Sequence, residues 1–143
     1  MLAIVAMLGL GGCGSDISTV HDAEFTFEQT FGSKPSPAIS KLQGGCSAFR
    51  DSGHCYLRFQ CPRKEFNRLR PASFTDMTKG AFSTEITNAG ITGPIPLWWT
   101  PLSGTSNEFW SSSAFHPTFF RGDALASYND ATQTAHFYWD GWD

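Results

Sequence analysis

Strict alternation along residues 54–61, HCYLRFQC, constrains the fold more than any other feature of this sequence. At the two-residue period of a β-strand, one face carries Cys55, Leu57, Phe59 and Cys61. The opposite face carries His54, Tyr56, Arg58 and Gln60. A strand that is apolar on one face and polar on the other is typical of an antiparallel sheet with one solvated side.

The segment before this run is its expected hairpin partner. Residues 38–49, AISKLQGGCSAF, read as a strand in which Gly44 and Gly45 introduce a bulge or bend. Residues 50–53, RDSG, suit a tight turn, because Asp and Ser support a type I turn and Gly accepts positive φ. The sequence therefore predicts an antiparallel hairpin over residues 38–61.

A second hairpin is predicted near the end of the sequence. Residues 124–130, ALASYND, form one strand, Ala131 and Thr132 mark the turn, and residues 133–140 form the return strand. The apolar face of the return strand carries Ala135, Phe137 and Trp139, and the other face carries His136 and Tyr138. Residues 72–96 are weakly patterned, and we expect turns or a further short helix there. The sequence around Trp98, Trp99 and Trp110, including the Ser-rich residues 103–113, is loop-like.

Two short helices complete the expected elements. Asp22 is placed to cap a helix over residues 23–31, which Gly32 ends, and Phe27 and Phe31 share its buried face at i, i+4 spacing. Pro62 suits the first turn of a second helix, PRKEFNRLR, whose buried face carries Phe66 and Leu69. The basic residues Arg63, Lys64, Arg68 and Arg70 are expected on its outer face.

Composition supports one mixed domain. Aromatic residues make up 15% of the 143 residues and charged residues only 16%, so the chain can bury a core. The 14 Gly and 8 Pro residues argue against a helix bundle. We expect an α+β fold, with a mostly antiparallel sheet of about four to five strands and one or two short helices on one side.

The first residues resemble a signal peptide for export. Residues 2–10 form a short apolar run, about half the length that a membrane-spanning helix needs, but long enough for a signal peptide. Leu10-Gly11-Gly12-Cys13 follows, and it resembles the lipobox of bacterial lipoproteins. The resemblance implies that the thiol of Cys13 receives a diacylglyceryl group, that residues 1–12 are removed, and that the new amino terminus is acylated, with palmitate as a typical chain.

The lipobox sets the expected organisation and location. Residues 1–12 would be the signal peptide, residues 13–22 a polar tether and residues 23–143 a single α+β domain. The protein would face the periplasm or cell surface from a membrane, and Gly14, where many inner-membrane lipoproteins have Asp, favours the outer membrane. No basic residue precedes the apolar run, so we expect the natural start to lie upstream.

The remaining cysteines are expected to meet an oxidising compartment. Cys55 and Cys61 lie in one predicted strand and are about 20 Å apart, too far for a bridge, since the Cα atoms must approach within about 7 Å. Cys46 should therefore be a partner in any disulfide, with Cys55 and Cys61 both open as the other half. The cysteine spacings do not match a zinc site, and no metal or other cofactor is predicted.

Few features of the sequence suggest catalysis. HExxH, GxSxG and the phosphate-binding P-loop pattern are all missing from the sequence. A net charge of −3 argues against a nucleic-acid module. Five of the ten basic residues lie within residues 58–70, where they could form a solvated helix face or meet an acidic partner or anionic lipid.

The function predicted from these features is that of a small, non-enzymatic, membrane-anchored lipoprotein that binds a protein or envelope partner. The expected contact residues are Trp98, Trp99, Arg63, Arg68 and Trp142. One alternative is a carbohydrate- or peptidoglycan-binding module that uses Trp98, Trp99 and Trp110, because indole faces stack on sugar rings. A second alternative is a hydrolase with a site that no motif reveals, such as a thiol of Cys55 or Cys61 beside His116 or His136.

Overall fold

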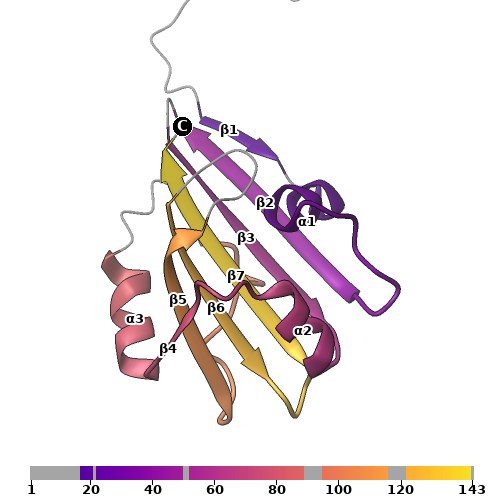
Figure 1. Cartoon of the computed structure of the whole chain (residues 1–143). Helices are drawn as coiled ribbons and strands as arrows, with labels where there is room; N and C mark the ends of the chain where they lie inside the picture. Colours follow the sequence, from indigo (N-terminus) through magenta and orange to yellow (C-terminus); the bar gives the residue numbers. More distant parts are fainter. Residues whose placement is uncertain (1–16, 21, 50–51, 89–94, 116–121, 143) are drawn as a thin grey trace, which may run out of the picture.

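The fold is α+β, with one antiparallel sheet and three helices (Figure 1). The computed structural model describes residues 17–20, 22–49, 52–88, 95–115 and 122–142. The strands in that part of the chain are β1 (Ile17–Val20), β2 (Ser40–Phe49), β3 (Ser52–Gln60), β4 (Thr75–Met77), β5 (Asn107–Phe115), β6 (Gly122–Asn129) and β7 (Thr134–Trp142). The helices are α1 (Ala23–Phe31), α2 (Arg63–Leu69) and α3 (Lys79–Asn88). None of these helices is long and apolar enough to cross a membrane.

The two predicted hairpins are confirmed and lie next to each other. The strand order is β1-β2-β3-β7-β6-β5-β4, so the β2–β3 hairpin meets the β6–β7 hairpin at the β3–β7 boundary. There the two strands pair from Ser52 opposite Trp142 to Gln60 opposite Thr134 without a register shift. The sheet thereby joins the two most strongly alternating segments of the sequence.

Helix α1 begins and ends where its local sequence predicts. The side chain of Asp22 accepts a hydrogen bond of 3.0 Å from the backbone N–H of Phe25, and Gly32 closes the helix at φ 71°. The rings of Phe27 and Phe31 lie 4.7 Å apart on the inner face. Helix α2 likewise buries Phe66 and Leu69, as its spacing predicts.

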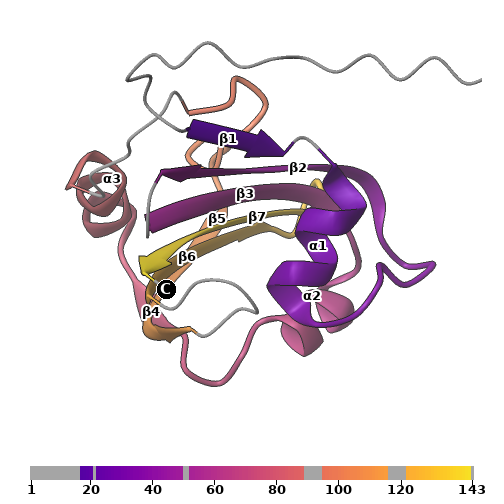
Figure 2. The ribbon, with the colours of Figure 1, turned by 90° about the horizontal axis from the view of Figure 1, so that it is seen from above.

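Both faces of the sheet are covered. On one face, α1 and α2 pack over a core that includes Phe27, Leu57, Phe59, Phe66 and Phe137. On the other face, α3 and residues 98–102 cover a smaller cluster, which includes Tyr56, Phe82, Trp99, Phe109 and Tyr138. Figure 2 shows α2 and the loop that begins at residue 95 on opposite sides of the strands.

Several expectations are wrong in extent. The sheet has seven strands in the described part rather than four to five, and α3 makes a third helix, on the side opposite α1 and α2. Strand β5 falls in the Ser-rich stretch that was expected to be loop, and β1 forms inside the expected tether. On the polar face of β3, which was expected to meet water or a partner, His54 and Tyr56 are buried within the chain, whereas Arg58 and Gln60 are half-buried. The lipobox, Cys13 and residues 50–51 lie outside the described residues.

The register between β2 and β3 resolves the cysteine pairing. Cys46 lies opposite Cys55, their Cα atoms are 4.1 Å apart, and a disulfide joins them. The prediction that Cys46 takes part is confirmed, and of the two open partners Cys55 is the one used. Cys61 is a buried free thiol.

The paired glycines of β2 allow close packing and do not form the expected bulge. The register shift falls between Ser40 and Gln43, where Lys41 has a φ of 49°. A Cβ atom on Gly44 would lie 2.9 Å from Leu57 Cδ2, 3.1 Å from Thr26 Cβ and 3.2 Å from Ala23 Cα. The lack of a side chain at Gly44 therefore lets α1 pack closely against β2.

We predict that Gly44→Ala destabilises the domain by about 1–3 kcal/mol, because the added methyl group forces α1 away from β2. Gly80→Ala is the matched control, since a Cβ atom there meets nothing within 4 Å and alanine favours α3 by up to about 1 kcal/mol. Denaturant unfolding measures both variants. Equal stability of the two variants would contradict this account of α1 packing.

Candidate functional site

A band of polar and aromatic side chains lies on the sheet face opposite α1 and α2. The β3–β7 register sets three cross-strand pairs side by side: His54 with Asp140, Tyr56 with Tyr138, and Arg58 with His136. Alternation along both strands aims all six side chains at the same face. We call these six residues the polar band.

Residues 98–102 cover the middle of the polar band. The indole N–H of Trp99 donates a 3.0 Å hydrogen bond to the carbonyl oxygen of Phe137. The Trp99 ring lies 5.0 Å from that of Tyr56 and 6.0 Å from that of Tyr138. Trp99 is therefore a buried cover for the polar band.

Burial controls the titration of the band. Desolvation raises the pKa of Tyr56 and of Tyr138 above the usual range, and the neighbouring Asp140 carboxylate adds to both shifts. The hydroxyl of Tyr138 donates a 2.8 Å hydrogen bond to Asp140 Oδ2. Desolvation lowers the pKa of His54, which Asp140 partly opposes, and lowers the pKa of His136 to about 3.

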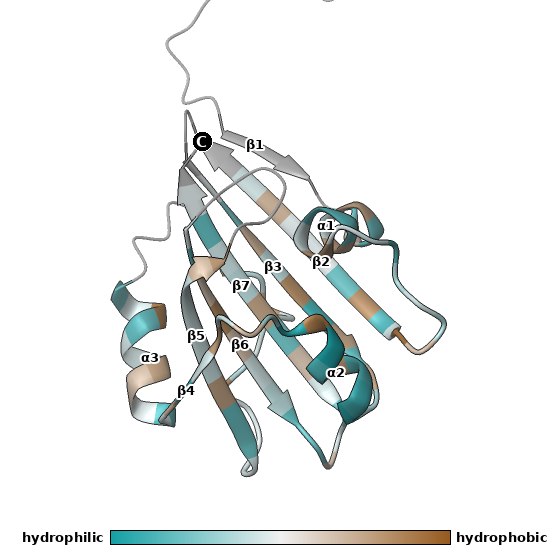
Figure 3. Ribbon diagram, in the orientation of Figure 1, coloured by the Kyte–Doolittle hydropathy of each residue, from teal (hydrophilic) through white to brown (hydrophobic). Residues whose placement is uncertain are grey.

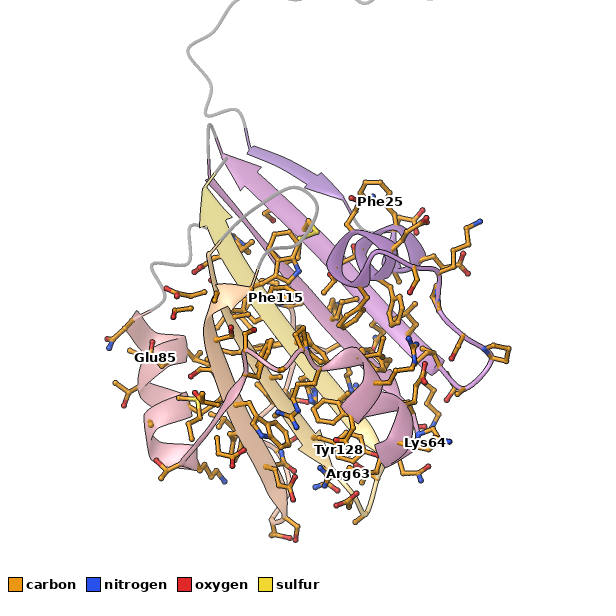
Figure 4. All side chains as sticks on the ribbon, viewed as in Figure 1. Phe25, Arg63, Lys64, Glu85, Phe115 and Tyr128 are labelled. Carbon is orange, nitrogen blue, oxygen red and sulfur yellow. A yellow bond between two sulfur atoms is a disulfide. The ribbon has the colours of Figure 1, made fainter. Side chains whose placement is uncertain are left out.

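Three buried atoms of the band have no hydrogen-bond partner in the described structure. They are Nε2 of His54, the hydroxyl of Tyr56 and Nε2 of His136. Next to the band, Tyr138 and Asp140 also form part of the wall of a polar pocket of about 480 Å³, together with Asp123, Glu85 of α3 and several serines (Figure 4). Such a lining suits hydrogen bonding to a polar group. Among the described residues, no cluster of His, Cys, Asp or Glu is arranged to hold a metal ion.

The sheet register also aligns a serine, a histidine and a carboxylate. Ser47 lies opposite His54, which lies opposite Asp140. No hydrogen bond joins these three described side chains, and Nε2 of His54 is unpartnered. The row therefore lacks the contacts that activate a serine nucleophile.

The thiol candidates are separated from the histidines. Cys55 is held in a disulfide, so it offers no thiolate. Burial raises the pKa of Cys61 to about 12, and its side chain belongs to the α1–α2 core rather than to the face that carries His136. His116 lies outside the described residues. Of the proposed pairs, those between His136 and either cysteine are therefore not brought together in the described structure.

The tryptophans expected to contact a partner differ in exposure. Trp99 and Trp110 are 4% and 5% exposed, so neither offers the free ring face that sugar stacking requires. Trp98 is partly buried against the α3-side cluster and keeps part of its surface accessible. The side chain of Trp142 lies outside the described part.

The two arginines expected to contact a partner already form ion pairs within the chain. Arg63 binds Asp130 and, at 2.6 Å, Glu108, while its guanidinium lies over the Tyr128 ring (Figure 4). Arg68, with a side chain 56% exposed, pairs with Glu65 at 2.7 Å. That pair lowers the pKa of Glu65 to about 2. The outer surface of α2 is strongly hydrophilic (Figure 3), and Lys64 is exposed on it.

Sequence reasoning missed an exposed apolar loop. Leu97 is 97% exposed and Ile95 is 40% exposed, next to the partly exposed Trp98. One signal in the sequence could have indicated this loop. Residues 95–106, IPLWWTPLSGTS, contain no charged residue, and their small polar residues are only Ser and Thr.

Comparisons with protein-family models, with curated proteins and with solved structures give no match for this chain.

We predict that the buried histidines make the domain lose stability in acid. The pKa of His136 falls from 6.5 to about 3 on folding, so only the unfolded chain binds this proton between those values. The contribution of neutral His136 to the free energy of unfolding is fully present above pH 6.5. It declines as the pH falls toward 3, by at most about 1.4 kcal/mol per pH unit. His136→Gln should show a shallower decline between pH 6.5 and 5 in denaturant unfolding. An NMR titration that places the His136 midpoint near 6.5 would contradict the prediction.

Proposed function

We propose that this protein is a bacterial lipoprotein, acylated on Cys13 and held at a membrane of the cell envelope, with the outer membrane favoured. Its domain would bind an envelope or protein partner without catalysing a reaction. The Leu10-Gly11-Gly12-Cys13 lipobox at the end of a short apolar run supports the anchor. Two or three acyl chains anchor firmly, whereas one chain gives only marginal binding.

The observation that carries this proposal is the disulfide between Cys46 and Cys55. Disulfides persist in the periplasm and outside the cell and are rare in the cytosol. The bridge joins directly opposed residues of neighbouring strands and so belongs to the folded sheet. A chain with both an export address and a structural disulfide fits an extracytoplasmic protein.

The outer surface of α2 is the better candidate for partner contact than the tryptophans first considered. Lys64, Asn67 and Arg68 are exposed there, beside a shallow depression of about 550 Å³ that also includes Pro62 and Ala38. The sugar-binding alternative keeps only Trp98 of its three residues with accessible surface, so we do not favour it.

We predict that radioactive palmitate labels the protein in bacteria and that Cys13→Ser abolishes the label, because the thiol is the acceptor. Cys61→Ala is the matched control, since it also removes a thiol but lies in the buried core. Globomycin should cause the uncleaved, slower-migrating precursor to accumulate. Labelling that persists in Cys13→Ser would disprove the proposed anchor.

A photo-crosslinking residue tests the α2 surface in the same cells. Placed at Asn67, it should give a discrete adduct on irradiation, because this position is exposed on the proposed contact surface. Placed at Ala81, an exposed position of α3, it should give none. The same adducts from both positions, or no adduct from Asn67, would contradict partner binding at α2.

A further inference from the structure

The anchor and the domain are joined by a very short connection. Only Gly14, Ser15 and Asp16 separate Cys13 from Ile17, where β1 begins. A fully extended chain spans about 3.3–3.6 Å per residue, so the Cα atoms of Cys13 and Ile17 can be at most about 14 Å apart. Strand β1 is hydrogen-bonded to β2 from Ile17 to Val20 and so moves with the sheet. An acylated Cys13 would therefore hold the domain directly against the bilayer surface.

The exposed apolar loop lies on the sheet face opposite α1 and α2, which is also the side toward which β1 lies in Figure 2. In Figure 2, β1 and the salmon loop that begins at residue 95 both lie toward the top of the view, whereas α2 lies near the bottom. Trp99, which packs on Tyr56 and Tyr138, fixes the base of this loop to the sheet. The loop is thus attached to a rigid face and projects away from α1 and α2.

The chemistry of the loop suits the interface between lipid headgroups and acyl chains. Leu97 is almost fully exposed, Ile95 is 40% exposed and Trp98 is partly accessible. Tryptophan prefers this depth because its ring is amphipathic. Residues 95–106 contain no carboxylate, so anionic headgroups do not repel the loop, and no lysine or arginine that must remain hydrated.

We infer that residues 95–98 are a second membrane contact, with Leu97 and Trp98 inserted at the surface of the same bilayer that holds the acyl chains of Cys13. This inference rests on the proposed lipid anchor and adds an orientation to it. With β1 and the loop at the membrane, the outer surface of α2 faces away from it. The basic residues of α2 then do not contact the lipid of that membrane.

The test uses acylated wild-type protein in vesicles of phosphatidylethanolamine and phosphatidylglycerol, with and without a brominated phosphatidylcholine that quenches indoles at shallow depth. We expect bromolipid to quench the wild-type fluorescence. Trp98→Phe and Leu97→Asp should each lose most of this quenching, the first because the reporter is gone and the second because a carboxylate keeps the loop in water. Ala131→Asp adds the same charge at an exposed turn and should be quenched like the wild type.

Mass spectrometry of the same samples separates the two proposals. Protein without acyl chains refutes the anchor itself. Fully acylated protein whose quenching is the same in Leu97→Asp as in the wild type overturns the membrane contact alone and assigns the loop to a protein partner instead. Loss of quenching in Ala131→Asp as well would also overturn it, because the effect would then follow charge and not position.

Discussion

The pairing of β3 with β7 is the contact on which the rest of the structure depends. It joins two strands whose paired residues are more than 70 positions apart in the sequence, in a continuous register from Ser52 opposite Trp142 to Gln60 opposite Thr134. Because side chains alternate, a slip of one residue would turn one of the two strands over relative to the other. If β7 slipped, Phe137 would leave the core under α1 and α2, and Tyr138 would enter it. The correct register places the large core under α1 and α2 and the polar band under Trp99.

One row of cross-strand neighbours contains the disulfide and also contacts α1. Cys46, Cys55 and Trp139 are successive cross-strand neighbours. The disulfide closes one side of the row, and the indole N–H of Trp139 donates a 3.0 Å hydrogen bond to Thr30 of α1. Reducing the disulfide would therefore loosen the strand pair over which α1 packs, where Gly44 allows α1 to approach β2 closely.

Alternation of apolar and polar residues and helix-capping residues predicted the strands and the helix in which these signals are strong. They did not predict the strands whose sequence lacks such alternation. The β2–β3 and β6–β7 hairpins and the Asp22-capped helix all formed as expected. Strand β5 could not be predicted, because serines at positions 111–113 carry no polarity contrast between the two faces. Nor could the choice between Cys55 and Cys61, since it depends on the register of β2 against β3, which places Cys46 opposite Cys55.

The candidate site was predictable only in part. Alternation placed His136 and Tyr138 on a face separate from the core, but their burial comes from Trp99, a residue about 40 positions away in a segment without periodicity. The arginines were located on the correct helix, yet their engagement by Glu108, Asp130 and Glu65 depends on tertiary placement or on rotamer choice. The exposure of Leu97 likewise depends on the tertiary structure. The sequence Leu97-Trp98-Trp99 alone is equally compatible with a position in the core.

The central claim is that the protein lies on its membrane with β1 and residues 95–98 toward the lipid and α2 away from it. Electron paramagnetic resonance of spin labels tests this orientation directly, with one label at position 97 and another at position 64 of the acylated protein in vesicles. The account predicts that the label at position 97 is relaxed by oxygen and shielded from a water-soluble nickel complex, and that the label at position 64 behaves in the opposite way. Equal exposure of the two labels to the nickel complex would contradict it.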